Sequence, residues 1–313
     1  MKHKYLLFMS LLAPLFMSCN KDEAEEEGTS STVSYPVPIQ LTGLTIKESA
    51  VEGLETANSR VSSNKWDAND RIGVFMLQDG TYNLVEGSVN KVYFTETGDG
   101  KFSPEGDDNT IYLPEDGSFM DLLAYYPHKE LADNLLPIDL SDQSDQSALD
   151  IMRGTPTKVA YNNADPNIDM TFRHKMSQIG LVFQLGDNVV ESDLVGTRVV
   201  LQGIHTSGTY DPIRDRLVMG DAVGNVELFV SEDGKTSSGI IMPEDFPSQR
   251  SLLIYPKYNH EDSPFVFSIS ENQEFKPGKS YNYTVTMYRD SIDVDTSVTD
   301  WIDGGITEGE VIN

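Results

Sequence analysis

At residues 71–77 the chain reads Arg71-Ile72-Gly73-Val74-Phe75-Met76-Leu77, an apolar run with the length of one buried β-strand. Similar short runs recur along the chain with turn residues such as Gly117 between them, a spacing typical of antiparallel sandwiches. The other expected strands cover residues 39–46, 91–94, 111–114, 120–127, 168–172, 179–185, 197–204, 226–229, 239–242, 252–255, 265–269 and 281–287. Only Ser147–Met152 reads as a short helical turn, so the sequence predicts an all-β fold.

The chain is long enough for more than one domain. Its 313 residues have room for two ordinary domains and a targeting segment, and 38% of them are hydrophobic, enough for real cores. The strand pattern breaks at residues 161–167, where Asn, Asp and Pro gather. We therefore expect two antiparallel β-sandwich domains in tandem, at residues 37–166 and 167–313.

The charge of the chain limits its partners. It has 50 acidic and 23 basic residues, a formal net charge of −27. Such a surface repels phosphate backbones and anionic lipid heads. Binding to nucleic acid and electrostatic docking to a membrane are therefore not expected.

The N-terminus has the features of an export signal. Lys2 and Lys4 precede an apolar run over residues 6–17, which is too short for a permanent membrane span. The run ends in Phe16-Met17-Ser18-Cys19, and Cys19 is the sole cysteine. A small residue before a lone cysteine resembles a bacterial lipobox, with Phe16 in place of the usual Leu. This resemblance implies a signal peptide at residues 1–18 and acylation of Cys19, for example with palmitate; the alternative is a general secretory signal in which Cys19 is incidental.

Residues 19–36 form the expected tether. The stretch Asn20–Glu27 is acidic and is followed by Gly28-Thr29-Ser30-Ser31, so like charges extend it and nothing in it can be buried. An acidic run behind a lipidated cysteine also resembles the surface-export signal of lipoproteins displayed outside the outer membrane. The alternative is a plain flexible linker.

Seven local patterns follow one another in order between Ile39 and Trp301. They are Trp66–Met76; Phe102-Ser103-Pro104 with Ile111–Pro114; Leu123-Ala124-Tyr125-Tyr126-Pro127; Asp139–Gln143 with Asp150-Ile151-Met152; Phe172-Arg173-His174-Lys175-Met176-Ser177; Pro277–Thr286; and Val298-Thr299-Asp300-Trp301. Together they resemble the fimbrillin (type V pilin) family. The resemblance implies two transthyretin-like β-sandwiches, export as a lipoprotein to the outer membrane, and assembly into a pilus by strand exchange with other subunits, copies of itself or tip and anchor proteins.

The resemblance also implies particular site residues. A protease would cut after Arg60, before Val61, in an exposed loop; the alternative is that Arg60 is an ordinary surface residue. The first strand would then leave, and another strand would fill its groove. The residues of the displaced strand are Ile39, Leu41, Leu44 and Ile46, and those of the candidate donor tail are Ile302, Ile306, Val311 and Ile312. Glycines and acids make this tail a poor strand, so stalk, tip and accessory roles stay open.

No catalytic, cofactor or metal site is expected. The acids at 139, 142, 145 and 150 lack the glycine and terminal glutamate of a compact calcium loop, and the histidines at 128, 174, 205 and 260 have no zinc-ligand spacing. No Gly-x-Ser-x-Gly elbow occurs. Trp66 and Trp301 could stack on sugars, but both lie within the local patterns that resemble the fimbrillin family, and this position indicates core residues. The leading hypothesis is a pilus subunit; the second is a non-polymerising surface lipoprotein that binds a glycan or host protein, and a glycan hydrolase is third.

Overall fold

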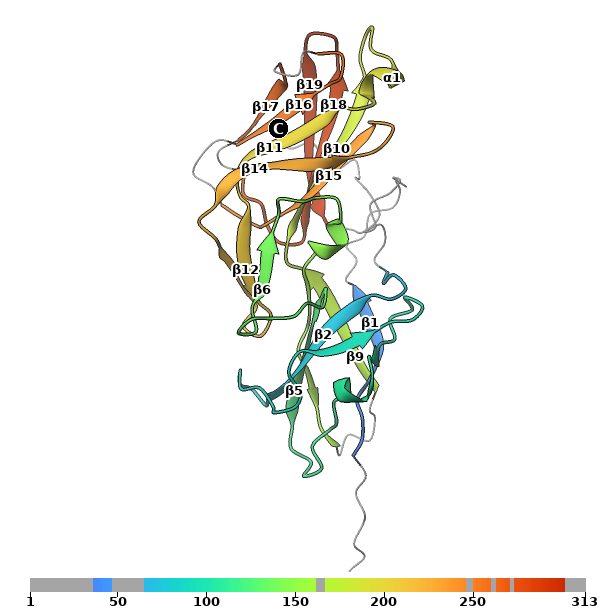
Figure 1. The fold of residues 1–313 in the computed structure, drawn as a ribbon, viewed down its shortest axis with the longest axis vertical. Helices are drawn as coiled ribbons and strands as arrows, with labels where there is room; N and C mark the ends of the chain where they lie inside the picture. Colours follow the sequence, from blue (N-terminus) through green and yellow to red (C-terminus); the bar gives the residue numbers. More distant parts are fainter. Residues whose placement is uncertain are drawn as a thin grey trace, which may run out of the picture. The chain divides into compact units, whose positions relative to one another are not determined.

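The computed structural model describes residues 36–46, 65–161, 167–245, 250–259, 263–270 and 273–301, all within one compact unit, Pro36–Asn313. It is almost entirely β-structure and contains two eight-stranded sheets and one small sheet of three strands (Figure 1). The two large sheets form sandwich- or barrel-like bodies in tandem, which confirms the expected fold class. In the described residues no helix is both long and apolar enough to cross a bilayer.

The first sheet is built mainly from the N-terminal half of the chain. In spatial order its strands are β1 (Gln40–Ile46), β9 (Asn167–His174), β7 (Met152–Gly154), β5 (Met120–Tyr126), β2 (Arg71–Gln78), β3 (Lys91–Phe94) and β4 (Ser103–Pro104), with β8 (Thr157–Val159) paired to β5. Phe102, next to β4, bridges to Leu41 of β1, so the two ends of the sheet meet. The sheet is thereby closed, and β1 lies at the seam.

The second sheet uses the C-terminal half. Its order is β17 (Phe265–Ile269), β16 (Arg250–Tyr255), β11 (Arg198–His205), β14 (Val223–Val230), β15 (Thr236–Ile241), β10 (Ser177–Leu185), β18 (Lys279–Met287) and β19 (Ile292–Asp300). A short helix, α1 (Glu191–Leu194), follows β10. The small sheet has the order β13 (Arg216–Met219), β12 (Ser207–Asp211) and β6 (Leu136–Asp139), so it joins a strand from each half of the chain.

The apolar run at residues 71–77 is buried on both of its faces. Ile72, Val74 and Met76 of β2 belong to one core cluster, around Trp66. The alternate residues Phe75 and Leu77 belong to the other, larger cluster. Because successive side chains of a strand point to opposite faces, a strand between two cores reads as a continuous apolar run.

The strand pairing differs from the expectation in three respects. First, β9 follows the expected domain break at residue 166 but pairs with β1 and β7 of the first sheet. The chain therefore passes from the first sheet to the second between His174, the end of β9, and Ser177, the start of β10. The strands β8, before the expected break, and β9, after it, thus belong to the same sheet. The domain limits themselves stay a prediction.

Second, the pairs β1–β9 and β10–β18 are parallel rather than antiparallel. Third, residues 111–114 form no strand, because Tyr112 makes only an isolated bridge to Pro38. The expected helical turn is a 3₁₀ turn at Gln146–Ala148, and Met152 already belongs to β7.

Candidate functional site around the first strand

The expected displaced strand is the strand at the seam, β1. The four expected apolar residues, Ile39 directly before β1 and Leu41, Leu44 and Ile46 within it, are 2%, 1%, 2% and 6% exposed and all lie in the core cluster around Trp66. Gln40 and Thr45 between them are exposed. Full burial of an Ile or Leu side chain stabilises a fold by about 1.5–3 kcal/mol, so β1 contributes strongly to this core.

Hydrogen bonds hold the backbone of β1 on both sides. On one side it runs parallel to β9, from the pair Gln40–Asn167 to the pair Ile46–Phe172. On the other side the N–H of Leu44 donates to the carbonyl oxygen of Gly100 (2.9 Å), and the N–H of Phe102 donates to that of Leu41 (2.8 Å). Near the start of β1 the N–H of Ile39 donates to the carbonyl oxygen of Ile111 (3.0 Å). Removing β1 would therefore leave donors and acceptors unpaired on two neighbouring segments.

Trp66 connects the core to the backbone of β1. Its indole Nε1–H donates a buried hydrogen bond to the carbonyl oxygen of Leu44, at 2.8 Å. Its ring makes edge-to-face contacts with Phe102, Tyr126 and Phe172, with centroids 5.0, 5.7 and 4.9 Å away. Trp66 is 5% exposed, so it is a core residue and offers no platform for a sugar.

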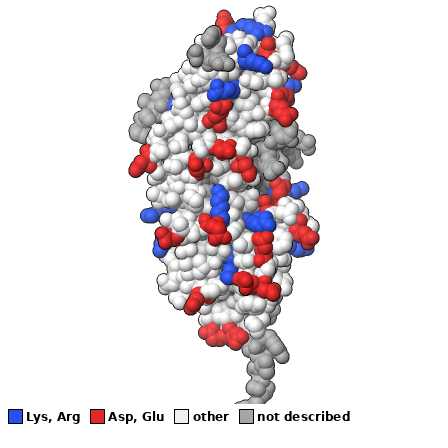
Figure 2. All heavy atoms as spheres, in the orientation of Figure 1, with Lys and Arg blue, Asp and Glu red and all other residues white. Residues whose placement is uncertain are grey.

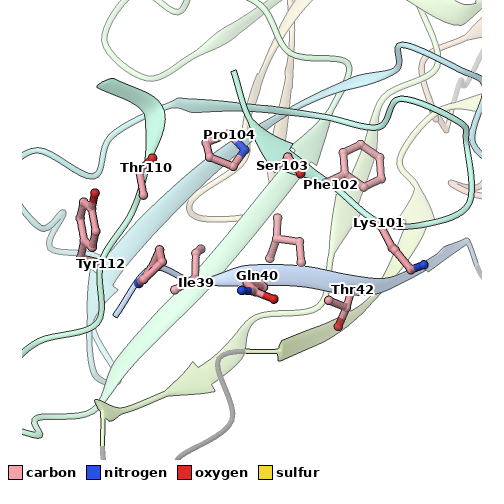
Figure 3. Close-up of a pocket in the computed structure, with 11 residues that line it drawn as sticks. Ile39, Gln40, Thr42, Lys101, Phe102, Ser103, Pro104, Thr110 and Tyr112 are labelled. Atoms are coloured by element: carbon pink, nitrogen blue, oxygen red, sulfur yellow. The ribbon is translucent and has the colours of Figure 1, made fainter. Parts of the chain in front are cut away.

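The segments that cover the outer edge of β1 diverge and leave a cavity of about 560 Å³ (Figure 3). Residues 38–42, at and just before the start of β1, form one wall, and residues 101–104, Thr110 and Tyr112 form the others. Tyr112 is 44% exposed, and the polar side chains of Gln40, Thr42 and Ser103 also line the cavity. The sequence did not predict this cavity, although the expected first strand and the pattern Phe102-Ser103-Pro104 with Ile111–Pro114 contribute residues to its lining.

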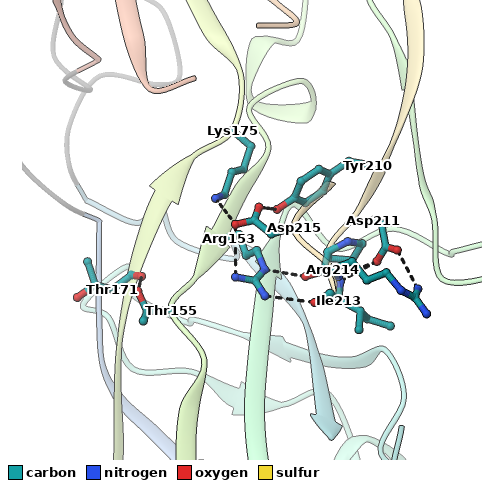
Figure 4. Close-up of polar contacts among 10 residues, drawn as sticks. Arg153, Thr155, Thr171, Lys175, Tyr210, Asp211, Ile213, Arg214 and Asp215 are labelled. Atoms are coloured by element: carbon teal, nitrogen blue, oxygen red, sulfur yellow. Dashed lines mark hydrogen bonds and ion pairs between the residues drawn. The ribbon is translucent and has the colours of Figure 1, made fainter. Parts of the chain in front are cut away.

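A second group of polar contacts anchors the small sheet to the first sheet (Figure 4). Asp215, in the turn between β12 and β13, accepts hydrogen bonds from Lys175 Nζ (2.8 Å) and from the Tyr210 hydroxyl (2.6 Å). Arg153 of β7 lies 3.6 Å from the same carboxylate and donates from Nε to the carbonyl oxygen of Pro212 (2.7 Å). Burial raises the pKa of Asp215, but the bonds from Lys175 and Tyr210 outweigh it, and the pKa lies below its ordinary value. This is a structural anchor.

The acidic residues considered for calcium do not converge. The carboxylates of Asp139 and Asp142 accept bonds from the N–H groups of Ser141 and Ser144, each at 2.9 Å. Asp150 instead faces His174, with 2.8 Å between Oδ1 and Nδ1. Among the described residues no group of three or more His, Cys, Asp or Glu side chains could hold a metal ion.

Two of the histidines are held by carboxylates within the fold. His174 stacks on Trp301, with ring centroids 4.3 Å apart and planes 11° apart, in addition to facing Asp150. Trp301 is 2% exposed and is a core residue. His205 Nδ1 lies 2.8 Å from Glu244 Oε2. These contacts account for the positions of His174 and His205 within the fold.

Several expected site residues lie outside the described part of the chain. They are the lipidation site Cys19, the cleavage site Arg60 and Val61, and the donor residues Ile302, Ile306, Val311 and Ile312. Their roles stay predictions. On the face drawn in Figure 2, acidic and basic side chains are interspersed without a large basic patch.

Both a family model and a related protein sequence connect the chain with fimbrial proteins. The model of the fimbrillin-like family matches residues 59–301. A Bacteroides uniformis protein described as a candidate fimbrium subunit, Fim1C, is 28% identical over 97% of both chains.

Solved structures of candidate cell adhesion proteins are similar in fold. One from Bacteroides uniformis is 25% identical, with a TM-score of 0.71, over 85% of this chain and 98% of its own. Another, from Bacteroides ovatus, is 23% identical, with a TM-score of 0.65, over 86% of this chain and 98% of its own.

Proposed function

The chain belongs to the fimbrillin-like family, and from this premise we propose that it is a subunit of a cell-surface fimbria. In this proposal the protein is exported as an outer-membrane lipoprotein through Cys19. Cleavage between Arg60 and Val61 then frees β1, and a strand of another subunit takes its place. The proposal assigns the chain a structural or adhesive role and no enzymatic one.

The position of β1 carries the proposal. A strand that closes a sheet, with four buried side chains and hydrogen-bonded neighbours on both sides, leaves a long apolar slot when it departs. An open edge and an exposed core cannot persist in water, and a strand from another chain can cover both. The buried side chains and backbone hydrogen bonds of β1 thus define both the slot and the kind of segment that would fill it, an extended strand with apolar side chains on one face.

Site-specific cleavage tests the proposal. An arginine-specific protease is expected to cut the purified chain after Arg60 and to produce oligomers, or complexes with a partner subunit, that survive unheated SDS electrophoresis. Arg60→Gln is expected to block both steps, whereas the matched variant Lys65→Gln, at an exposed position nearby, is expected to block neither. A compact monomer that accepts no strand after complete cleavage would refute strand exchange.

A separate measurement tests the lipid anchor. Cells that express the chain with labelled palmitate are expected to incorporate the label at Cys19, and Cys19→Ala is expected to lose the label and the membrane fraction. Export of the parent chain without any label at Cys19 would mean that the signal is a general secretory one.

The cavity beside β1 favours one second candidate, a surface lipoprotein that binds a glycan or a host protein without polymerising. An exposed tyrosine ring next to polar side chains, as at Tyr112, offers a sugar both stacking and hydrogen bonds. Tyr112→Ala is then expected to weaken glycan binding while cleavage at Arg60 has no effect on assembly. Assembly that depends on cleavage separates the first candidate from the second.

A further inference from the structure

The pairing of β1 with both of its neighbours is interrupted at the same place. Between Leu41 and Leu44 the strand advances by three residues, whereas its partners on β9 advance by two, from Ile168 to Met170. On the other edge Leu41 is bonded to Phe102 and Leu44 to Gly100, again two residues apart. The extra residue therefore belongs to β1 as a β-bulge, and both neighbours are regular there.

A bulge leaves one residue unpaired and disrupts the ladder locally. A strand without the extra residue would meet both neighbours of β1 residue by residue. Its apolar side chains would then alternate without interruption and still reach the sites that Leu41, Leu44 and Ile46 occupy, because side chains on a regular strand repeat every two residues. The bulge also brings Gly43 so close to Asp169 that an added Cβ would lie 2.0 Å from its carboxylate oxygen.

The tail of the chain does not supply such a strand. In residues 302–313 the apolar residues are Ile302, Ile306, Val311 and Ile312, and glycines or acids occupy most of the places between them. With regular alternation, the best placement puts two apolar side chains into four sites, for example Ile302 and Ile306 with Gly304 and Glu308. The bulged spacing of β1 does no better, since it pairs Ile306 and Val311 with Gly304 and Gly309.

We infer that the slot occupied by β1 accepts a strand from a different protein, one with four strictly alternating apolar side chains. Because of its bulge, β1 binds in this slot more weakly than such a strand. The inference rests on the proposed strand exchange. Gln40 and Thr45 are exposed, so the residues between the apolar ones can be polar. A proline at the position of Leu44 is excluded, because the N–H there donates to Gly100.

Labelled peptides test the inference on the full chain cleaved after Arg60. The first peptide copies residues 37–47, and the second is the same peptide without the residue at 43, which restores alternation. The third is the tail, residues 302–313. The control is the second peptide with Leu41→Ser and Leu44→Ser. Fluorescence anisotropy measures the affinity of each peptide, and mass spectrometry detects release of the resident β1 fragment.

The regular peptide is expected to bind about tenfold more tightly than the copy of β1, since about one further backbone hydrogen bond is recovered. The tail and the serine control are expected to bind more than about a hundredfold more weakly than the regular peptide, because each lacks two buried apolar side chains. A tail that binds as well as the regular peptide, or a regular peptide weaker than the bulged copy, would overturn the inference but leave strand exchange standing. Failure of both β1-derived peptides to exchange would overturn strand exchange itself, and the inference with it.

Discussion

Truncation of Leu44 to alanine tests how much of the first core depends on β1. Leu44 is 2% exposed and packs in the cluster around Trp66. Removing a buried leucine side chain costs the lost transfer free energy and the cavity left behind, about 2–5 kcal/mol. The carbonyl oxygen that accepts the Trp66 hydrogen bond belongs to the backbone and is kept, so the variant isolates the packing contribution.

Urea unfolding followed by tryptophan fluorescence measures this loss, since Trp66 lies against β1. The matched control is Leu185→Ala at a position 43% exposed, which is expected to change the free energy of unfolding by about 0.5 kcal/mol or less. After cleavage at Arg60, Leu44→Ala is also expected to weaken retention of the β1 fragment by about tenfold for every 1.4 kcal/mol. Equal losses for the two variants, or unchanged retention of the fragment, would refute the role assigned to β1.

Three further changes are predicted. Trp66→Phe leaves the carbonyl oxygen of Leu44 without its buried donor and is expected to lower the free energy of unfolding by about 1–3 kcal/mol in a urea titration. Gly100→Ala is expected to cost more than about 1 kcal/mol, because a Cβ would lie 2.7 Å from the Leu44 oxygen; Gly106→Ala, with the same positive φ and open space, measures the backbone strain alone. Asp215→Asn is expected to cost about 1 kcal/mol or less, as solvent screens this carboxylate. Since the folded-state pKa of Asp215 is depressed, that stabilisation is present above about pH 4 and is lost as the pH falls further, so the variant and the parent should converge in acid.

The sequence predicted the strands that carry a strong apolar signal. The run at 71–77 became β2, because it lies between two cores, and residues 39–46 became β1 with the four expected side chains buried. Strands without such a signal were missed. The strand β19, at Ile292–Asp300, is rich in Asp, Thr and Ser and only half-buried, so its pairing to β18 depends on tertiary structure.

The features that make β1 a site could not be predicted from local patterns. The imperfect alternation of residues 39–46 was visible, but its cause, an extra residue facing two regular neighbours, depends on segments far away in the chain. The closing edge at Gly100 and Phe102 comes from a stretch with little strand propensity. The cavity likewise depends on the divergence of residues 101–104 from Thr110 and Tyr112, which no single segment encodes.

The contacts of β1 also indicate how cleavage would act. The proposed cut after Arg60 removes none of the described contacts of β1, because its four buried side chains and its backbone hydrogen bonds lie within residues 39–46 and their neighbours. What cleavage would change is the effective concentration of β1 at its slot, because a covalent connection keeps a segment close to the site that it binds. Four buried side chains contribute about 6–12 kcal/mol before the cost of association, so a cut chain retains β1 for some time. In the proposed exchange the slot would therefore stay covered until a better-paired strand arrives, and the open, aggregation-prone state would never be appreciably populated.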